Sequence, residues 1–202
     1  MDAAVILRFL AVIVAAYFLG SLSFGWMVAR LRGVNILEQG SGNPGFTNVW
    51  RTLGIKWASL VLFLDGLKGY LAACIGYHLA GEWGMMIGFV VAILGHSCSW
   101  MLHFKGGKGI ATAGGALLYV SPVTLAILLV ILAIIVGLTK YMSLGSVTVC
   151  IIAPFLLYLE GQPPVVVGVI SCGVLYVIWL HRGNIKRLIN GTENKIGQKK
   201  RS

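Results

Sequence analysis

The sequence is poor in charge. Charged residues make up 11% of its 202 positions and hydrophobic residues 58%, and the mean hydropathy is +0.89. A soluble domain of this length carries about 25% charged residues, because its surface faces water. So low a share excludes an ordinary soluble enzyme and favours a protein whose solvent is lipid. The length allows one polytopic membrane domain over residues 1–202 and leaves no room for a separate soluble domain.

Acidic residues are the scarcest charged type, six against sixteen Lys and Arg, and they are scattered along the chain. A metal site needs several ligands close together. We therefore expect no metal and no cofactor, which disfavours a metal-dependent CDP-alcohol phosphotransferase. The net charge of +10 would suggest nucleic acid in a soluble protein. Here membrane orientation and anionic lipid headgroups explain most of it, so membrane lipids rather than nucleic acid are the expected partners.

Cysteine is also rare, with four residues in apolar stretches and no CxxC spacing. This pattern predicts small buried hydrophobic side chains rather than a redox or zinc motif. No clear small-residue cleavage site follows the N-terminal apolar run, which we interpret as a retained first span.

Seven apolar segments predict an all-α integral membrane fold with seven transmembrane helices. They are 5–29, 57–80, 84–102, 110–120, 123–139, 142–159 and 165–180. The fourth is too short for an ordinary span and ends at Ser121-Pro122, because proline interrupts helical hydrogen bonding. It can be thinned or partly re-entrant.

The distribution of basic residues favours seven crossings. With that count every Lys and Arg except Arg8 and Lys68 falls on one side of the membrane. Basic loops face the cytoplasm. We therefore expect the N-terminus outside and the C-terminus in the cytoplasm, with a basic tail at 196–202 that is disordered or rests on anionic lipid.

Three segments on the expected cytoplasmic side are rich in glycine, asparagine and basic residues: 38–51, 95–112 and 184–195. Glycines let backbone amides converge on a phosphate, and lysine and arginine supply positive charge. Taken alone, any one of these segments can be explained as a flexible cytoplasmic loop that binds nothing. Because all three face one compartment, together they predict a phosphate-binding site.

The first segment combines small polar side chains with one arginine. Its candidate ligands are Ser41, Gly42, Asn43, Gly45, Thr47, Asn48 and Arg51. Arg51 is one helical turn beyond Thr47, so both can face one ligand. The alternative is that the polar residues only form turns and cap helices.

The second segment joins His96 to a glycine-lysine run. Its candidates are His96, Lys105, Gly106, Gly107, Lys108 and Thr112. Thr112 is near the start of an expected helix, where the dipole favours an anion, although the run lacks the spacing of an NTPase P-loop. His96 is either a packed core residue, a proton acceptor or a phosphate donor. In the second apolar segment, Asp65 and Lys68 are three residues apart, and we expect them to pair with each other or to brace the site.

The third segment contributes Asn184, Lys186, Arg187 and Glu193. In order along the chain, the motifs are Gly40-Ser41-Gly42-Asn43 with Thr47-Asn48 and Arg51; Gly95-His96 with the KGGKG run; and Asn184 with Gly191-Thr192-Glu193-Asn194. They resemble the bacterial acyl-phosphate:glycerol-3-phosphate acyltransferases over essentially the whole chain.

The resemblance implies a bacterial inner-membrane enzyme with seven spans and a cytoplasmic active site. It would move a fatty acyl group from acyl phosphate to the sn-1 hydroxyl of glycerol 3-phosphate, giving lysophosphatidic acid and phosphate. We expect it to act as a monomer. The alternatives are a transporter or channel for phosphate-bearing solutes and a non-catalytic lipid-binding protein.

On this interpretation the first loop cradles the acyl phosphate, and Ser41 and Lys105 serve either phosphate. The expected ligands of glycerol 3-phosphate are Arg51, Lys108, Asn184 and Lys186 or Arg187. Glu193 would orient the tail or a basic partner. Of these residues, we predict catalytic roles for His96, Ser41, Lys108 and Asn184. The base is either His96 or a phosphate oxygen of the substrate.

Overall fold

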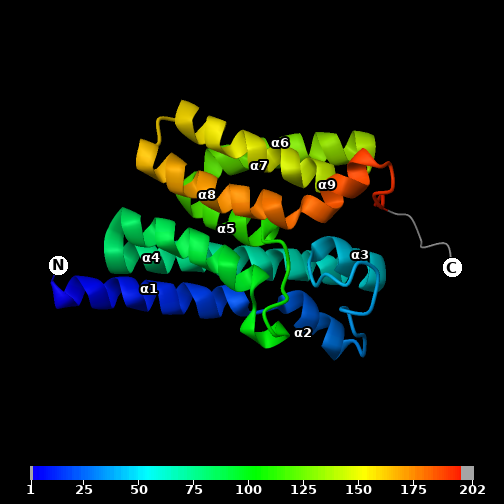
Figure 1. The fold of residues 1–202 in the computed structure, drawn as a ribbon, viewed down its shortest axis with the longest axis horizontal. Helices are drawn as coiled ribbons and strands as arrows, with labels where there is room; N and C mark the ends of the chain where they lie inside the picture. Colours follow the sequence, from blue (N-terminus) through cyan, green and yellow to red (C-terminus); the bar gives the residue numbers. More distant parts are fainter. Residues whose placement is uncertain (1, 197–202) are drawn as a thin grey trace. The chain divides into compact units, whose positions relative to one another are not determined.

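The computed structural model describes residues 2–196, and its regular elements in that range are all helices. In chain order they are α1 (Ala3–Ser21), α2 (Phe24–Leu31), α3 (Phe46–Leu53), α4 (Ile55–Ser97), the 3-10 helix η1 (Trp100–Leu102), α5 (Ile110–Val120), α6 (Pro122–Thr139), α7 (Met142–Leu159), α8 (Pro164–Leu180) and α9 (Arg182–Ile189) (Figure 1). The all-α prediction is confirmed for this range. Of the predicted basic tail, residues 197–202 lie outside the described residues.

Four helical stretches within the described range are long and apolar enough to cross a membrane: 3–31, 55–102, 122–139 and 142–159. α8 and α9 are bent by 56° relative to each other, and if this pair counts as one span, the number of candidate spans rises to five. The chain is therefore a multi-pass membrane protein. Each of the seven predicted segments is largely helical, but the number of crossings and their direction stay a prediction.

The helix predicted over 5–29 is broken. α1 ends at Ser21 and α2 begins at Phe24, and Leu22 between them is extended, with ψ of 109°. Side chains fasten this break to the end of α4: the Ser99 hydroxyl donates to the Ser21 carbonyl, and Tyr17 donates to the Cys98 carbonyl at 3.0 Å. The break frees the Leu22 carbonyl from its helix.

α4 is a hairpin rather than one rod. Ala80 and Gly81 have non-helical backbone, and Gly81 has a positive φ of 63°, which favours glycine. Across the hairpin Gly76 faces Gly84 so closely that a Cβ on either residue would overlap the other's carbonyl oxygen. The two arms thus correspond to the apolar segments predicted at 57–80 and 84–102, although the second arm ends at Ser97.

The chain forms two compact units, and the first ends at Val120. Close approach between helix backbones holds this first unit together. α5 lies against α4 where Gly115 meets Gly66, and α1 lies against α4 where Gly20 meets Ala92 (Figure 1). Lipid supplies no hydrophobic drive for helices to associate, so membrane helices pack through small residues that allow close contact. Glycines at these helix contacts therefore serve packing.

The second compact unit begins at Ser121. In it α7 packs against both α6 and α8. The Ser121 side chain accepts from the Thr124 amide at 2.9 Å and so caps α6. The hydroxyl groups of Ser121 and Thr124 also donate hydrogen bonds to the Glu160 carboxylate, and these bonds tie the start of α6 to the end of α7.

The four cysteines are free, and they differ in exposure. Cys150 is buried as predicted, but Cys172 is exposed on α8. An apolar side chain on a membrane helix need not be buried in protein, because lipid is equally apolar.

Gly88 and Gly168 provide a matched test of the packing. A Cβ on Gly88 would overlap the Ala72 carbonyl oxygen across the α4 hairpin, whereas a Cβ on Gly168 meets nothing within 4 Å. We expect Gly88→Ala to lower the free energy of unfolding by about 1 to 3 kcal/mol through overpacking. Gly168→Ala should be neutral or stabilising by up to about 1 kcal/mol through helix propensity. Denaturant titration in detergent, followed by circular dichroism, measures both. Equal stabilities would contradict the close hairpin.

Candidate active site

Lys68 is the centre of a buried polar cluster. The residue is 2% exposed, and its Nζ is 2.7 Å from Asp65 Oδ1, 2.6 Å from the Leu22 carbonyl oxygen and 2.8 Å from His96 Nδ1. The Phe24 ring lies on another side, with its centroid 5.6 Å from Nζ. The ammonium group is thus enclosed by three oxygen or nitrogen atoms and an aromatic face.

These contacts explain how a charge is tolerated here. An ammonium in an apolar environment is costly unless it is paired and hydrogen-bonded. Asp65 is one helical turn before Lys68, and the predicted pair between them is confirmed. The Leu22 carbonyl is available only because α1 ends just before it. His96 is 28 positions away and arrives through the α4 hairpin.

The glycine-lysine loop docks onto the end of α4. The amides of Gly106 and Gly107 donate to the carbonyls of Ser97 and His96, at 2.8 and 3.1 Å. A Cβ on Gly107 would overlap His96 Nε2, so only glycine lets the loop lie against the imidazole. Both amides, which we predicted to bind substrate, are therefore already hydrogen-bonded within the protein.

Donors remain at the start of α5. The first amides of a helix, here those of residues 110–112, have no intrahelical acceptor and carry the positive end of the dipole. Thr112 is fully buried, and its hydroxyl has no hydrogen-bond partner among the described residues. Lys105 is exposed and Lys108 is half-buried in the same loop. Together they make a cationic environment of the kind that binds phosphate.

The first glycine-rich loop is braced by its own asparagines. Asn48 is 2% exposed; its Oδ1 accepts from the Ser41 amide at 3.0 Å, and its Nδ2 donates to the Gln39 carbonyl at 2.9 Å. Asn43 Oδ1 accepts from the Gly45 amide at 2.9 Å. Both asparagines therefore form turns, the alternative that the sequence left open, and they hold the loop in one shape.

Side chains at the edge of this loop remain exposed or half-buried. Ser41 is exposed, and Gly42 next to it has a positive φ of 68°. α3 starts directly after Gly45, and on it Thr47 and Arg51 are four residues apart and half-buried. That spacing puts both on one helix face, as predicted.

In the second unit, Glu193 gathers the polar residues of the third motif. Its carboxylate accepts from Asn184 Nδ2 at 2.6 Å, Ser143 Oγ at 2.9 Å and Arg187 Nε at 2.6 Å. Burial alone would raise the pKa of Glu193, but the bonds from Asn184, Ser143 and Arg187 outweigh it and hold the pKa below its ordinary value. Glu193 therefore orients Asn184 and Arg187, while Lys186 is exposed.

One buried polar residue of this unit was missed from the sequence. His181 is 4% exposed at the start of α9, with Nδ1 2.8 Å from the Val177 carbonyl oxygen. A carbonyl only accepts, so Nδ1 carries the proton. The sequence did contain a signal for His181, because it stands one helical turn before Asn184. Our prediction for this segment included only residues that follow it.

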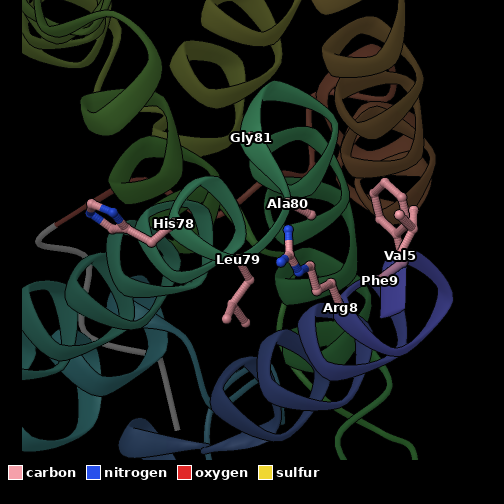
Figure 2. Close-up of a pocket in the computed structure, with 7 residues that line it drawn as sticks. All are labelled: Val5, Arg8, Phe9, His78, Leu79, Ala80 and Gly81. Atoms are coloured by element: carbon pink, nitrogen blue, oxygen red, sulfur yellow. The ribbon is translucent and has the colours of Figure 1, made fainter. Parts of the chain in front are cut away.

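A cavity of about 370 Å³ lies at the other end of unit 1, by the α4 turn. Figure 2 shows its lining, in which the Arg8 side chain reaches toward Ala80 and the His78 ring points away from Arg8. No polar groups converge there, and it includes no residue of the three motifs. We do not take it as the substrate site.

Known proteins match this sequence over nearly the whole chain. The model of the glycerol-3-phosphate acyltransferase family matches residues 10–191. The glycerol-3-phosphate acyltransferase of Clostridioides difficile (strain 630) is 41% identical, over 96% of this chain and 98% of that protein. That of Aquifex aeolicus (strain VF5) is 42% identical, over 94% of this chain and the whole of its own length, 100%.

Two crystal structures have the same fold. Both are of PlsY (YgiH), an integral membrane glycerol 3-phosphate acyltransferase, 39% identical over 94% of this chain. The match to the glycerol 3-phosphate form has a TM-score of 0.90 and covers 96% of the solved chain. The match to the lysophosphatidic acid form has a TM-score of 0.88 and covers 95% of the solved chain. From the family match and the shared fold, this chain belongs to the glycerol-3-phosphate acyltransferase family of integral membrane proteins.

Proposed function

We propose that this protein transfers a fatty acyl group from acyl phosphate to the sn-1 hydroxyl of glycerol 3-phosphate. The products are lysophosphatidic acid and inorganic phosphate. The observation that carries the proposal is the glycine-lysine loop, docked beside buried His96 at the end of an apolar helix hairpin. A donor with a phosphate head and a long acyl chain needs a cationic loop of this kind next to lipid.

The proposed enzyme lies in the bacterial inner membrane as a monomer, with its active site on the cytoplasmic face. Seven crossings put the N-terminus outside and the C-terminus inside. The α4 hairpin supports this count by supplying two arms, and α5, with 11 residues, is the short crossing. The one-sided distribution of Lys and Arg supports the orientation.

For the acyl phosphate, we propose that the phosphate binds at the start of α5 and beside the first loop. Its ligands are Ser41, Thr47, Lys105 and the free amides of the first α5 turn, where the helix dipole stabilises negative charge. The braced backbone at Gly42, Asn43, Gly45 and Asn48 shapes the loop rather than donating to the ligand. Gly106 and Gly107 keep the loop close to His96.

For glycerol 3-phosphate, Arg51 and Lys108 are the proposed ligands within the first unit. Arginine can hold two phosphate oxygens at once, and lysine adds a compact charge. The roles of Asn184, Lys186 and Arg187 as ligands of the same phosphate stay a prediction of the sequence. Glu193, in turn, keeps Asn184 and Arg187 in fixed orientations.

The proposed reaction is a direct displacement. The sn-1 hydroxyl oxygen attacks the acyl carbon, the bond from that carbon to the phosphate oxygen breaks, and the hydroxyl proton passes to the departing phosphate. Acyl phosphate is an activated mixed anhydride, so positioning and charge stabilisation supply most of the rate. Of the two bases considered, we favour the phosphate oxygen, because His96 Nδ1 already faces the Lys68 ammonium.

Purified protein supplied with acyl phosphate and glycerol 3-phosphate should release inorganic phosphate and lysophosphatidic acid in equal amounts. Omitting glycerol 3-phosphate should stop both. Phosphate colorimetry and lipid mass spectrometry measure the products. Accumulation of labelled glycerol 3-phosphate in liposomes without acylation would instead identify a transporter.

Arg51→Ala should raise the KM for glycerol 3-phosphate about 10- to 100-fold, because a hydrogen bond to a charged group contributes about 1.5 to 3 kcal/mol. The KM for acyl phosphate should change little. Lys56→Ala, at an exposed position in the first turn of α4, is the matched control for removing one positive charge. Steady-state kinetics measure all three proteins, and an unaltered KM in Arg51→Ala would rule out this placement.

A further inference from the structure

We infer that Lys68 fixes the tautomer of His96, so that the imidazole presents an N–H donor at Nε2 to the glycine-lysine loop. Lys68 is then a positioning residue, and His96 donates a hydrogen bond to the phosphate or to the oxyanion that forms during transfer. The role in transfer rests on the proposed function. The protonation pattern itself depends only on the contacts of the buried cluster.

The first step is a count of donors and acceptors around Lys68. An ammonium group has three protons and no acceptor. Its nitrogen forms an ion pair with a carboxylate oxygen of Asp65, 2.7 Å away, and is at hydrogen-bond distance from the Leu22 carbonyl oxygen and His96 Nδ1. The first two can only accept. If each proton has one acceptor, the third proton goes to His96 Nδ1.

The opposite tautomer fails on geometry. A proton on Nδ1 would point at the Lys68 ammonium, 2.8 Å away, and two donors would face each other. Asp65 Oδ1 does not offer an alternative, because it is 3.7 Å from Nδ1, beyond hydrogen-bond length. Deprotonating Lys68 would remove the clash but leave the buried Asp65 carboxylate without its ion partner. Nδ1 therefore carries a lone pair.

A neutral imidazole with a lone pair on Nδ1 has its proton on Nε2. His96 is 7% exposed, and the hydrogen bonds of the described residues include no partner for Nε2. Nε2 lies against Gly107, where a Cβ would overlap it. The donor is therefore aimed at the loop that leads into α5, where we place the phosphate.

This arrangement suits acyl transfer to an alcohol. A preorganised donor beside a developing negative charge lowers the barrier without having to reorient during the reaction. It also agrees with the phosphate oxygen as proton acceptor, because the one nitrogen of His96 that can accept is occupied by Lys68. Lys68 and Asp65 from α4 and Gly107 from the loop all lie next to the imidazole.

Nitrogen-15 NMR of histidine-labelled full-length protein in nanodiscs tests the tautomer directly. The signals of the four histidines are assigned by comparison with His96→Gln. We expect His96 to show an unprotonated Nδ1 and a protonated Nε2. A protonated Nδ1 in the wild-type protein would overturn the inference, whatever the enzyme proves to catalyse.

The side-chain amide of glutamine can supply an N–H near the position of Nε2 but cannot act as a base. We therefore expect His96→Ala to lose about 100-fold or more in kcat, the range found for removing one such donor, and His96→Gln to recover at least about tenfold of that loss. His78→Gln, on the first arm of α4 and exposed, is the matched control and should keep wild-type kcat. Equal losses in His96→Gln and His96→Ala would mean that His96 is not acting as a donor.

The positioning role of Lys68 is tested in a double variant that leaves no buried charge unpaired. The double variant Lys68→Met with Asp65→Asn removes both partners, since deleting one alone would leave an uncompensated charge in the core. We expect His96 to populate both tautomers in this protein and kcat to fall with little change in KM. If His96 keeps the proton on Nε2 in the folded double variant, Lys68 has only a structural role. Absence of phosphate release by the wild-type protein would instead refute the proposed function.

Discussion

The structure depends on how one charge is accommodated in a chain whose solvent is lipid. The Lys68 side chain is buried in α4, with 2% of the residue exposed, so acceptors for its ammonium group must come from the protein itself. Asp65, Leu22 and His96 do so from three places: the preceding turn of α4, the break after α1 and the end of the second arm. One interaction thus joins the first helix, both arms of the hairpin and the edge of the proposed site.

The two loops of the first unit that we propose to bind substrate use much of their backbone to hold their own shape. In the first loop, the side chains of Asn48 and Asn43 accept hydrogen bonds from the amides of Ser41 and Gly45. In the glycine-lysine loop, the amides of Gly106 and Gly107 donate to carbonyl oxygens at the end of α4. The groups left for substrate are side chains and the first turn of α5. A loop built this way is rigid before substrate arrives, which favours positioning as the source of catalysis.

Much of the fold was predictable because lipid imposes a simple rule on composition. Apolar segments of sufficient length predicted the helices, and the three-residue spacing of Asp65 and Lys68 predicted their pairing. The break at Leu22 was not predicted. Gly20, Ser21 and Ser23 surround it, but small residues of this kind also occur inside continuous membrane helices, and the acceptor is required by a residue in another helix. The contact of Lys68 with His96 depends on the turn at Gly81, which brings distant positions together. Which amides of a glycine-rich loop are occupied also depends on packing, and composition does not contain that information.

A crystal structure with a non-transferable phosphonate analogue of acyl phosphate tests most directly whether the Lys68 cluster prepares a phosphate site. We predict that the phosphonate lies at the first turn of α5 with an oxygen about 3 Å from His96 Nε2, and that Lys68 keeps its contacts to Asp65, Leu22 and Nδ1. A phosphonate bound away from α5, or a His96 ring turned so that Nε2 faces Lys68, would contradict this.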